Sequence, residues 1–186
     1  MPKPYKPSLP PQEEFEIARE FNKRATIHSE HVDLRWEVPI AYVQFSDGYS
    51  FSLFQYEEGI LKKQQIYSRL VDMVKAQRGH SGLVGKKDAF NIMSEAGEIM
   101  IEAEDLYNLA NLRLGYRVTD SHDLLYKMEG QRLVAIGIDF EYHQKMTQEE
   151  QAQLIKNERK SRIRGKRKSD TRRLRFESMF DANAAP

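Results

Sequence analysis

Residues 32–56 read VDLRWEVPIAYVQFSDGYSFSLFQY, and this stretch decides the class of fold. In its first half, apolar residues at every second position alternate with Asp33 and Arg35, which predicts a strand with one buried face. Two runs rich in aromatic and β-branched residues follow at 40–45 and 49–56, and the Asp-Gly dipeptide between them predicts a β-hairpin. The sequence therefore predicts a strand followed by a β-hairpin over residues 32–56.

The patterns on either side of this stretch add helices and a second hairpin. Apolar residues at helical spacing predict helices over residues 12–26, 60–77, 87–114 and 147–163, and a hairpin over 124–142 turns at Glu129-Gly130. Consecutive hairpins without crossover helices are typical of antiparallel sheets. We therefore expect an α+β fold: an antiparallel sheet built from two β-hairpins packed against three to four helices, with a C-terminal basic helix and tail.

Length and composition suggest one domain with two tails. We expect an extended proline-rich arm over residues 1–11, a globular α+β domain over 12–146 and a basic helix and tail over 147–186. The sequence has no cysteine, which excludes disulfides, thiolate zinc sites and cysteine nucleophiles. No signal-peptide core and no long apolar run is present, so we expect a soluble, cytoplasmic protein without a membrane partner. We also expect no cofactor and no bound metal.

The most distinctive feature is a run of basic residues near the end of the sequence, which we call the basic arm, residues 156–175. It contains eleven Lys and Arg residues against two acids, a net charge of +9 in a chain whose total is +1, so the remaining residues carry −8. Cationic side chains that neutralise phosphates release condensed counterions, so this asymmetry predicts a polyanionic partner. The nucleic-acid-binding residues that we predict in the arm are Arg159, Lys160, Arg162, Arg164, Lys166, Arg167, Lys168, Arg172, Arg173 and Arg175. The arm has no aromatic residue, which favours contact with the nucleic-acid backbone over reading of bases.

Lys86 and Lys87 are a second candidate contact with phosphate. They follow the glycine-rich segment 78–85 at the start of the longest predicted helix, where backbone amides can also receive a phosphate. The segment lacks the spacing of a P-loop and follows a helix, so we do not predict a nucleotide site.

The acidic residues of the predicted strand 134–143 suggest an alternative, catalytic reading. On a strand, Asp139, Glu141 and His143 would share one face and could hold Mg²⁺ or Mn²⁺ for phosphodiester cleavage. The tetrapeptide Ile138-Asp139-Phe140-Glu141 resembles the first motif of DEDD-type exonucleases, in which an Asp and a Glu two residues apart bind the catalytic metals. The resemblance covers these four residues and implies a metal-binding role for Asp139 and Glu141. His28 and His31 also form an HxxH pair, but no third ligand is evident for zinc.

Two further segments call for a contact. An acidic helix face with Glu95, Glu98, Glu102 and Asp105 is most simply solvated, but it could also receive the basic arm of the same or a neighbouring chain. The residues Leu174, Phe176, Met179 and Phe180 form an apolar group that is too small to fold alone, so it should dock on the body or on a partner.

The function that we expect is a non-enzymatic nucleic-acid-binding accessory protein of a larger assembly. Its basic arm would contact RNA or DNA phosphates, and its α+β body would bind a protein partner or a second copy. One alternative is a metal-dependent nuclease centred on Asp139, Glu141 and His143. The other is a protein-interaction module, an inhibitor or scaffold, whose arm binds an acidic partner surface.

Overall fold

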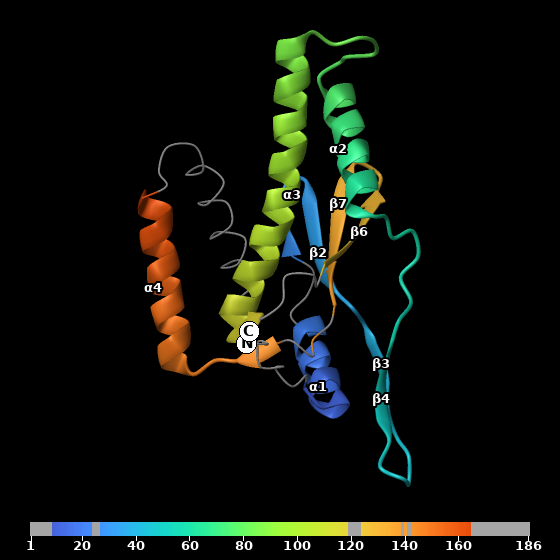
Figure 1. Cartoon of the computed structure of the whole chain (residues 1–186), viewed down its shortest axis with the longest axis vertical. Helices are drawn as coiled ribbons and strands as arrows, with labels where there is room; N and C mark the ends of the chain where they lie inside the picture. The colour runs from blue at the N-terminus through green and yellow to red at the C-terminus, as the bar shows by residue number, and fades with distance from the viewer. Residues whose placement is uncertain (1–8, 24–26, 119–123, 139, 141–142, 165–186) are drawn as a thin grey trace, which may run out of the picture.

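The computed structural model of this chain describes residues 9–23, 27–118, 124–138, 140 and 143–164, with the backbone alone for 158–164. In chain order its elements are α1 (Pro11–Asn22), β1 (Ile27–His28), β2 (Val32–Trp36), β3 (Pro39–Gln44), β4 (Ser50–Phe54), α2 (Lys63–Gln77), α3 (Lys86–Leu114), β5 (Tyr116–Val118), β6 (Leu124–Glu129), β7 (Arg132–Gly137), β8 (His143–Lys145) and α4 (Gln148–Arg164). Figure 1 shows α3 as the spine of the molecule, with the main sheet on one side of it and α4 on the other. None of the helices in the described ranges has both the length and the apolar content needed to cross a membrane.

The main sheet is mixed. Its four strands lie in the order β1-β2-β7-β6, and β2 runs parallel to β7 while the outer pairs are antiparallel. The α+β class is confirmed, but the prediction of a purely antiparallel sheet made from the two hairpins is wrong. The β6–β7 hairpin joins β2 after a connection that contains α2 and α3, and a connection of that length allows neighbouring strands to run in the same direction.

The inner face of this sheet packs against α3. Alternate residues of β2, Val32, Leu34 and Trp36, enter the core together with Leu133 and Ala135 of β7. Trp36 lies opposite Gly137 in the parallel pair, and a Cβ at Gly137 would lie 2.5 Å from two carbons of the indole ring. Only glycine therefore allows β7 to pass the tryptophan at this distance.

The first predicted hairpin is present, but it forms a separate two-stranded ribbon of β3 and β4. Gly48 turns the ribbon with a φ of 89°, a backbone conformation that glycine adopts without strain. One face of the ribbon packs on α1, where the Ser52 hydroxyl donates a hydrogen bond of 2.6 Å to the carbonyl oxygen of Pro11. Figure 1 shows the turn of the ribbon projecting beyond the rest of the body.

The second hairpin ends earlier than the pattern predicts. Its second strand, β7, stops at Gly137, and His143 begins a new short strand, β8, that pairs with β5. Between them Phe140 turns fully into the core, where its ring lies 5.5 Å from the ring of Phe21. Burial of this aromatic ring replaces the continuous strand expected over 133–142.

Candidate nucleic-acid interface and other candidate sites

The root of the basic arm is the start of α4, which begins with the predicted capping box. The Thr147 hydroxyl accepts a hydrogen bond of 3.2 Å from the amide of Glu150, and the Glu150 carboxylate accepts one of 2.9 Å from the amide of Thr147. The hydrogen bond from the Thr147 amide, followed by the interaction of the Thr147 hydroxyl with the same carboxyl, lowers the pKa of Glu150 from its usual value. The N-terminus of α4 is therefore capped by hydrogen bonds within its own first turn.

Gln151 attaches this first turn of α4 to the body. Its side-chain amide donates hydrogen bonds of 2.8 and 3.0 Å to the carbonyl oxygens of Leu112 and Arg113. Those carbonyls belong to the last turn of α3, where the regular bonds of the helix run out, and the Leu112 carbonyl also accepts a bond of 3.2 Å from the amide of Gly115. Figure 1 shows α4 running back beside α3 in the opposite direction. Beyond Gln151 the described side chains of α4 are mostly exposed, and Lys156 is among them.

The structure places only part of the predicted basic arm. Arg159, Lys160, Arg162 and Arg164 lie on the helical backbone of α4, and Lys156, Lys160 and Arg164 share one side of it because they are four residues apart. The remaining predicted contacts lie outside the described residues: Lys166, Arg167, Lys168, Arg172, Arg173 and Arg175. The described part of the arm is thus a helix that is attached at its beginning and carries its positive charge toward its far end.

Lys86 and Lys87 are exposed in the first turn of α3, as the predicted phosphate contact requires. The structure does not bring them beside the described basic residues of α4. At a rise of 1.5 Å per residue, Lys86 is about 39 Å along α3 from Leu112, whereas Arg164 is about 20 Å along α4 from Gln151. Two cationic regions therefore lie on the same side of the sheet, about 20 Å apart along the helix axes.

Of the alternative catalytic group, the structure describes His143 alone. Asp139 and Glu141 lie outside the described residues. His143 is 1% exposed, and its ring is surrounded by the rings of Phe21, Tyr107, Tyr116 and Phe140. The expected outward position of His143 is wrong because β7 ends before it and the chain turns into the core. Within the described ranges, no group of three side chains is arranged to hold a metal ion.

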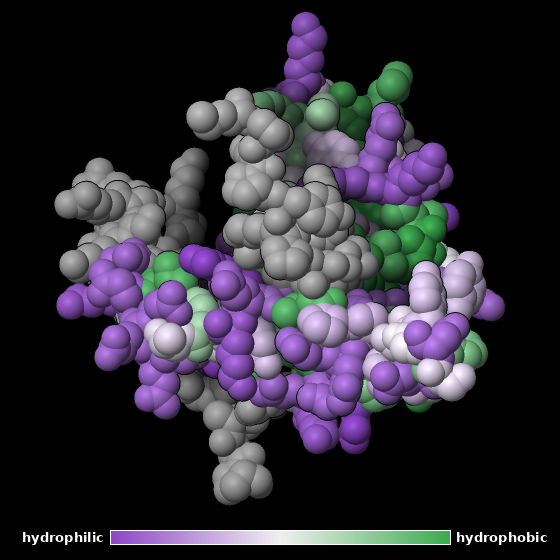
Figure 2. Space-filling view, turned by 60° about the horizontal axis from the view of Figure 1, so that its bottom comes forward, coloured by the Kyte–Doolittle hydropathy of each residue, from purple (hydrophilic) through white to green (hydrophobic). Residues whose placement is uncertain are grey.

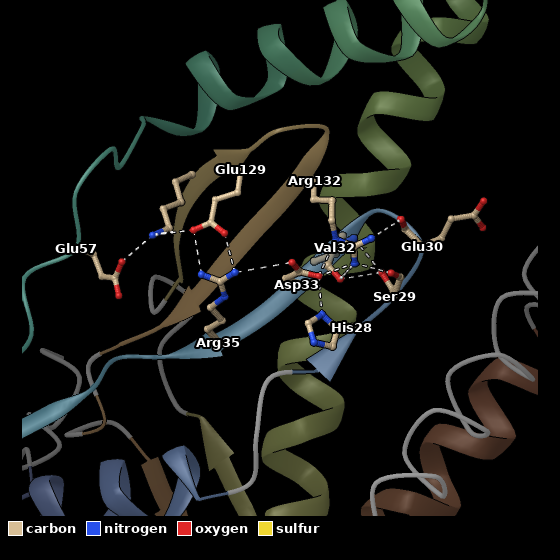
Figure 3. A network of polar contacts seen from close by, with 10 residues as sticks. His28, Ser29, Glu30, Val32, Asp33, Arg35, Glu57, Glu129 and Arg132 are labelled. Atoms are coloured by element: carbon tan, nitrogen blue, oxygen red, sulfur yellow. Dashed lines mark hydrogen bonds and ion pairs between the residues drawn. The ribbon is translucent and has the colours of Figure 1, made fainter.

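The outer face of the main sheet carries a line of paired charges that the sequence analysis did not single out (Figure 3). At one end lies Asp33 of β2, whose side chain is 8% exposed. Its carboxylate accepts a hydrogen bond of 2.9 Å from Nε of Arg132 and lies 2.8 Å from Nδ1 of His28. Arg132 also donates to the backbone carbonyls of Ser29 and Glu30, which fixes the β1–β2 turn against β7.

The line continues across the sheet from β2 to β6. Arg35 donates to both carboxylate oxygens of Glu129, at 2.9 and 2.7 Å. Lys127 then lies 3.1 Å from Glu129 and 2.8 Å from Glu57, which follows the ribbon. Val134 and Ile136 lie under these side chains and are buried although no helix of the described chain packs on this face. The aliphatic stems of the cations cover them.

The charges of this line, which we call the sheet network, change one another's pKa. Burial raises the pKa of Asp33, but the hydrogen bonds from Arg132 and His28 and their positive charges outweigh it, so the pKa lies below the ordinary value. Hydrogen bonds from Arg35 and Lys127 lower the pKa of Glu129, and the contact with Glu129 raises the pKa of Arg35. The pKa of Lys127 is raised first by its hydrogen bond with Glu57 and then by the one with Glu129. Each of these charges faces an opposite one, so the sheet network holds the strands together and leaves no charge to attract a ligand. The sequence does contain a signal for this network: opposite charges stand two positions apart in β2, at Asp33 and Arg35, and in β6, at Lys127 and Glu129.

The face of the β3–β4 ribbon that turns away from α1 carries an exposed apolar surface. Its residues are between 37% and 74% exposed: Ile40, Phe45, Tyr49, Phe51 and Leu53. The segment 39–61 contains three acids and no Lys or Arg. Figure 2, in which the lower end of Figure 1 faces the viewer, shows a mostly hydrophilic surface with hydrophobic side chains gathered on the side of the ribbon. A surface of this composition suits a protein contact and offers nothing to phosphate.

Comparisons with protein families, with curated proteins and with solved structures found no match to this chain. The proposed function therefore rests on the sequence and the structure of this chain alone.

Proposed function

We propose that the chain is a nucleic-acid-binding accessory protein without enzymatic activity of its own. Its basic arm contacts the phosphates of RNA or DNA, and its α+β body makes protein contacts. The observation that carries this proposal is a net charge of +9 over residues 156–175 in a chain of +1. Such a density is suited to phosphate backbones, because each neutralised phosphate releases a counterion.

Three features of the structure support the proposal. The arm begins on a helix whose first turn is attached to the body, and Lys156 is exposed on that helix. Lys86 and Lys87 add exposed cations on the same side of the sheet. The apolar ribbon face, which carries no cation, supports a separate protein contact by the body.

A salt titration of nucleic-acid affinity tests the proposal on the full chain. The triple variant Lys166→Gln, Arg167→Gln, Lys168→Gln is compared with a matched variant of three exposed cations of the body, Lys23→Gln, Arg69→Gln, Lys145→Gln. Binding to a fluorescent 20-base-pair duplex is followed by anisotropy between 50 and 200 mM KCl. Because each phosphate contact contributes about 0.9 to the slope of log K against log salt, the arm variant should have a slope shallower by about 2.7.

The matched variant should keep the slope of the unmodified chain. Equal slopes for the two variants would show that the arm does not meet phosphates, and the proposal would fail. Repeating the titration with single-stranded RNA and DNA of equal length compares the possible nucleic-acid partners. If the arm variant instead loses an acidic protein partner while its affinity for every nucleic acid is unchanged, the interaction-module alternative is supported.

A further inference from the structure

One flank of α3 carries exposed apolar residues. Phe90, Met93 and Ile101 are 73%, 51% and 56% exposed, and at 3.6 residues per turn they lie within about 80° of one another around the helix. Leu83, in the loop before the helix, is fully exposed as well. We call these four residues the outward stripe. A helix of a water-soluble domain ordinarily has its polar residues on this side, so the stripe calls for a partner.

The direction of α4 leads the chain toward this stripe. The helix is attached beside Leu112 and runs back along α3, on the side opposite the sheet (Figure 1). The rise of an α-helix carries Arg164 about 20 Å from Gln151, which brings it about level with Ile101. Phe90 lies about 16 Å further in the same direction. The end of the described chain therefore points along the outward stripe.

The segment that follows Arg164 has the composition to cover the stripe. Eleven residues separate Arg164 from Phe176, and the twelve Cα–Cα steps between them can span about 40 Å when extended, more than twice the distance that remains along α3. The large apolar residues beyond Arg164 are Leu174, Phe176, Met179 and Phe180, and the last three have helical i, i+3, i+4 spacing. Glu98 and Asp105 lie beside the stripe on α3, so this flank of the helix is acidic, opposite in charge to the basic residues between Arg164 and Leu174.

The size of the stripe favours an occupant on the same chain. With about 200 Å² for each large apolar side chain, the four residues offer roughly 500 Å² of exposed area. That is less than the ~800 Å² per partner that a stable interface between separate molecules buries. A segment tethered by a short flexible linker has an effective concentration in the millimolar range and does not need the larger interface.

We propose that residues 174–180 dock on the outward stripe of α3. The basic residues between Arg164 and Leu174 then form a strap that is held at both ends. A strap of this kind gives up less conformational freedom on meeting a polyanion than a free tail does. The docking itself needs no nucleic acid and stands or falls independently of the proposed function.

Pairwise cross-linking tests this docking, because the chain has no cysteine of its own. The variant Met93→Cys with Met179→Cys is treated with a short bis-maleimide at 1 µM protein, after nuclease treatment and gel filtration in 0.5 M salt. The matched variant pairs Met179→Cys with Tyr49→Cys, at the turn of the ribbon, where Tyr49 is 74% exposed against 51% for Met93, so that accessibility favours the control pair. Non-reducing gels and peptide mass analysis separate products within one chain from dimers. We expect the 93–179 product to form within one chain, at least tenfold faster than the 49–179 product.

A third variant links the cross-link to apolar docking. Adding Phe176→Asp and Phe180→Asp to the 93–179 pair should reduce its rate to that of the 49–179 pair. Equal rates for the two original pairs would overturn the proposal. A product found mainly as a dimer would overturn it as well, because the occupant of the stripe would then be a second copy. Since nucleic acid is removed, failure of the phosphate contact would leave this result unchanged.

Discussion

Removing the buried carboxylate of Asp33 should destabilise the chain far more than removing the exposed carboxylate of Glu129, although both belong to the sheet network. Asp33 is 8% exposed and joins His28 of β1 to Arg132 of β7, so its loss removes the acceptor that these two side chains share. Loss of one partner of a fully buried ion pair costs ~3–5 kcal/mol. Arg132 is 37% exposed and keeps its bonds to the backbone carbonyls, so we expect about 2–3 kcal/mol for Asp33→Ala.

Unfolding by urea and by heat at pH 7, each followed by circular dichroism, measures this difference in the free energy of unfolding. Asp33→Ala should lower the thermal midpoint by roughly 4–12 °C, at ~2–4 °C per kcal/mol for a chain of this size. Glu129→Ala is the matched control: its carboxylate is 42% exposed and its partners reach water, so its loss should cost less than about 1 kcal/mol. Equal losses of stability in the two variants would refute the view that burial makes Asp33 the centre of the sheet network.

The same contact predicts how stability depends on pH. The pKa of Asp33 is lower in the folded chain than the ~3.9 of an unfolded aspartate, so its contribution is fully present above that value. The contribution is lost as the pH falls through the folded pKa. The free energy of unfolding should therefore fall less steeply below pH ~4 in Asp33→Asn than in the unmodified chain. If the free energy of unfolding depended on pH in the same way in both proteins, the contacts of the Asp33 carboxylate with its partners would not stabilise the folded chain.

Four other substitutions test the packing and the attachment of α4. Gly137→Ala should cost about 1–3 kcal/mol in urea unfolding, because the added carbon meets the buried ring of Trp36, and an unchanged midpoint would contradict the close approach. Phe21→Ala should lower the free energy of unfolding by about 3–5 kcal/mol, because its ring is buried in the core. Phe45→Ala, on the exposed ribbon face, should lower it by less than about 1 kcal/mol. Equal losses would mean that the ribbon face is covered. Gln151→Ala should speed amide hydrogen exchange in α4 by roughly tenfold, because it removes hydrogen bonds that contribute about 1–1.5 kcal/mol to the attachment of the helix. Unchanged exchange would show that α4 is attached through other contacts.

The sequence predicted the elements whose signals are local. The long helix was expected over 87–114 and is observed at Lys86–Leu114, where Gly115 ends it with a φ of 82°. The capping box of α4 and the turn at Gly48 were found for the same reason, because each depends on residues within a few positions of one another. Local periodicity and turn chemistry are sufficient for such features.

The features that the sequence did not predict depend on distant partners. Alternation in β2 showed which residues face inward, but not that β7 would pair with it in parallel. The inward turn of Phe140, which ends the second hairpin early, depends on an aromatic pocket that Phe21 supplies from more than a hundred residues away. The sheet network was missed because its charges alternate on separate strands, and only the register of β2, β7 and β6 brings them together.

The distribution of charge also limits what the two proposed surfaces can bind. The ribbon carries three acids and no cation over 39–61, so it would repel a phosphate backbone, whereas its aromatic face loses water most favourably against another apolar surface. The basic arm has the opposite composition: its cations are strongly hydrated, and it has no aromatic residue to bury in a protein interface. Neither surface can replace the other. We therefore expect a protein partner on the ribbon and a nucleic acid on the arm to bind at the same time, so that substitutions on the ribbon face leave the salt dependence of nucleic-acid binding unchanged.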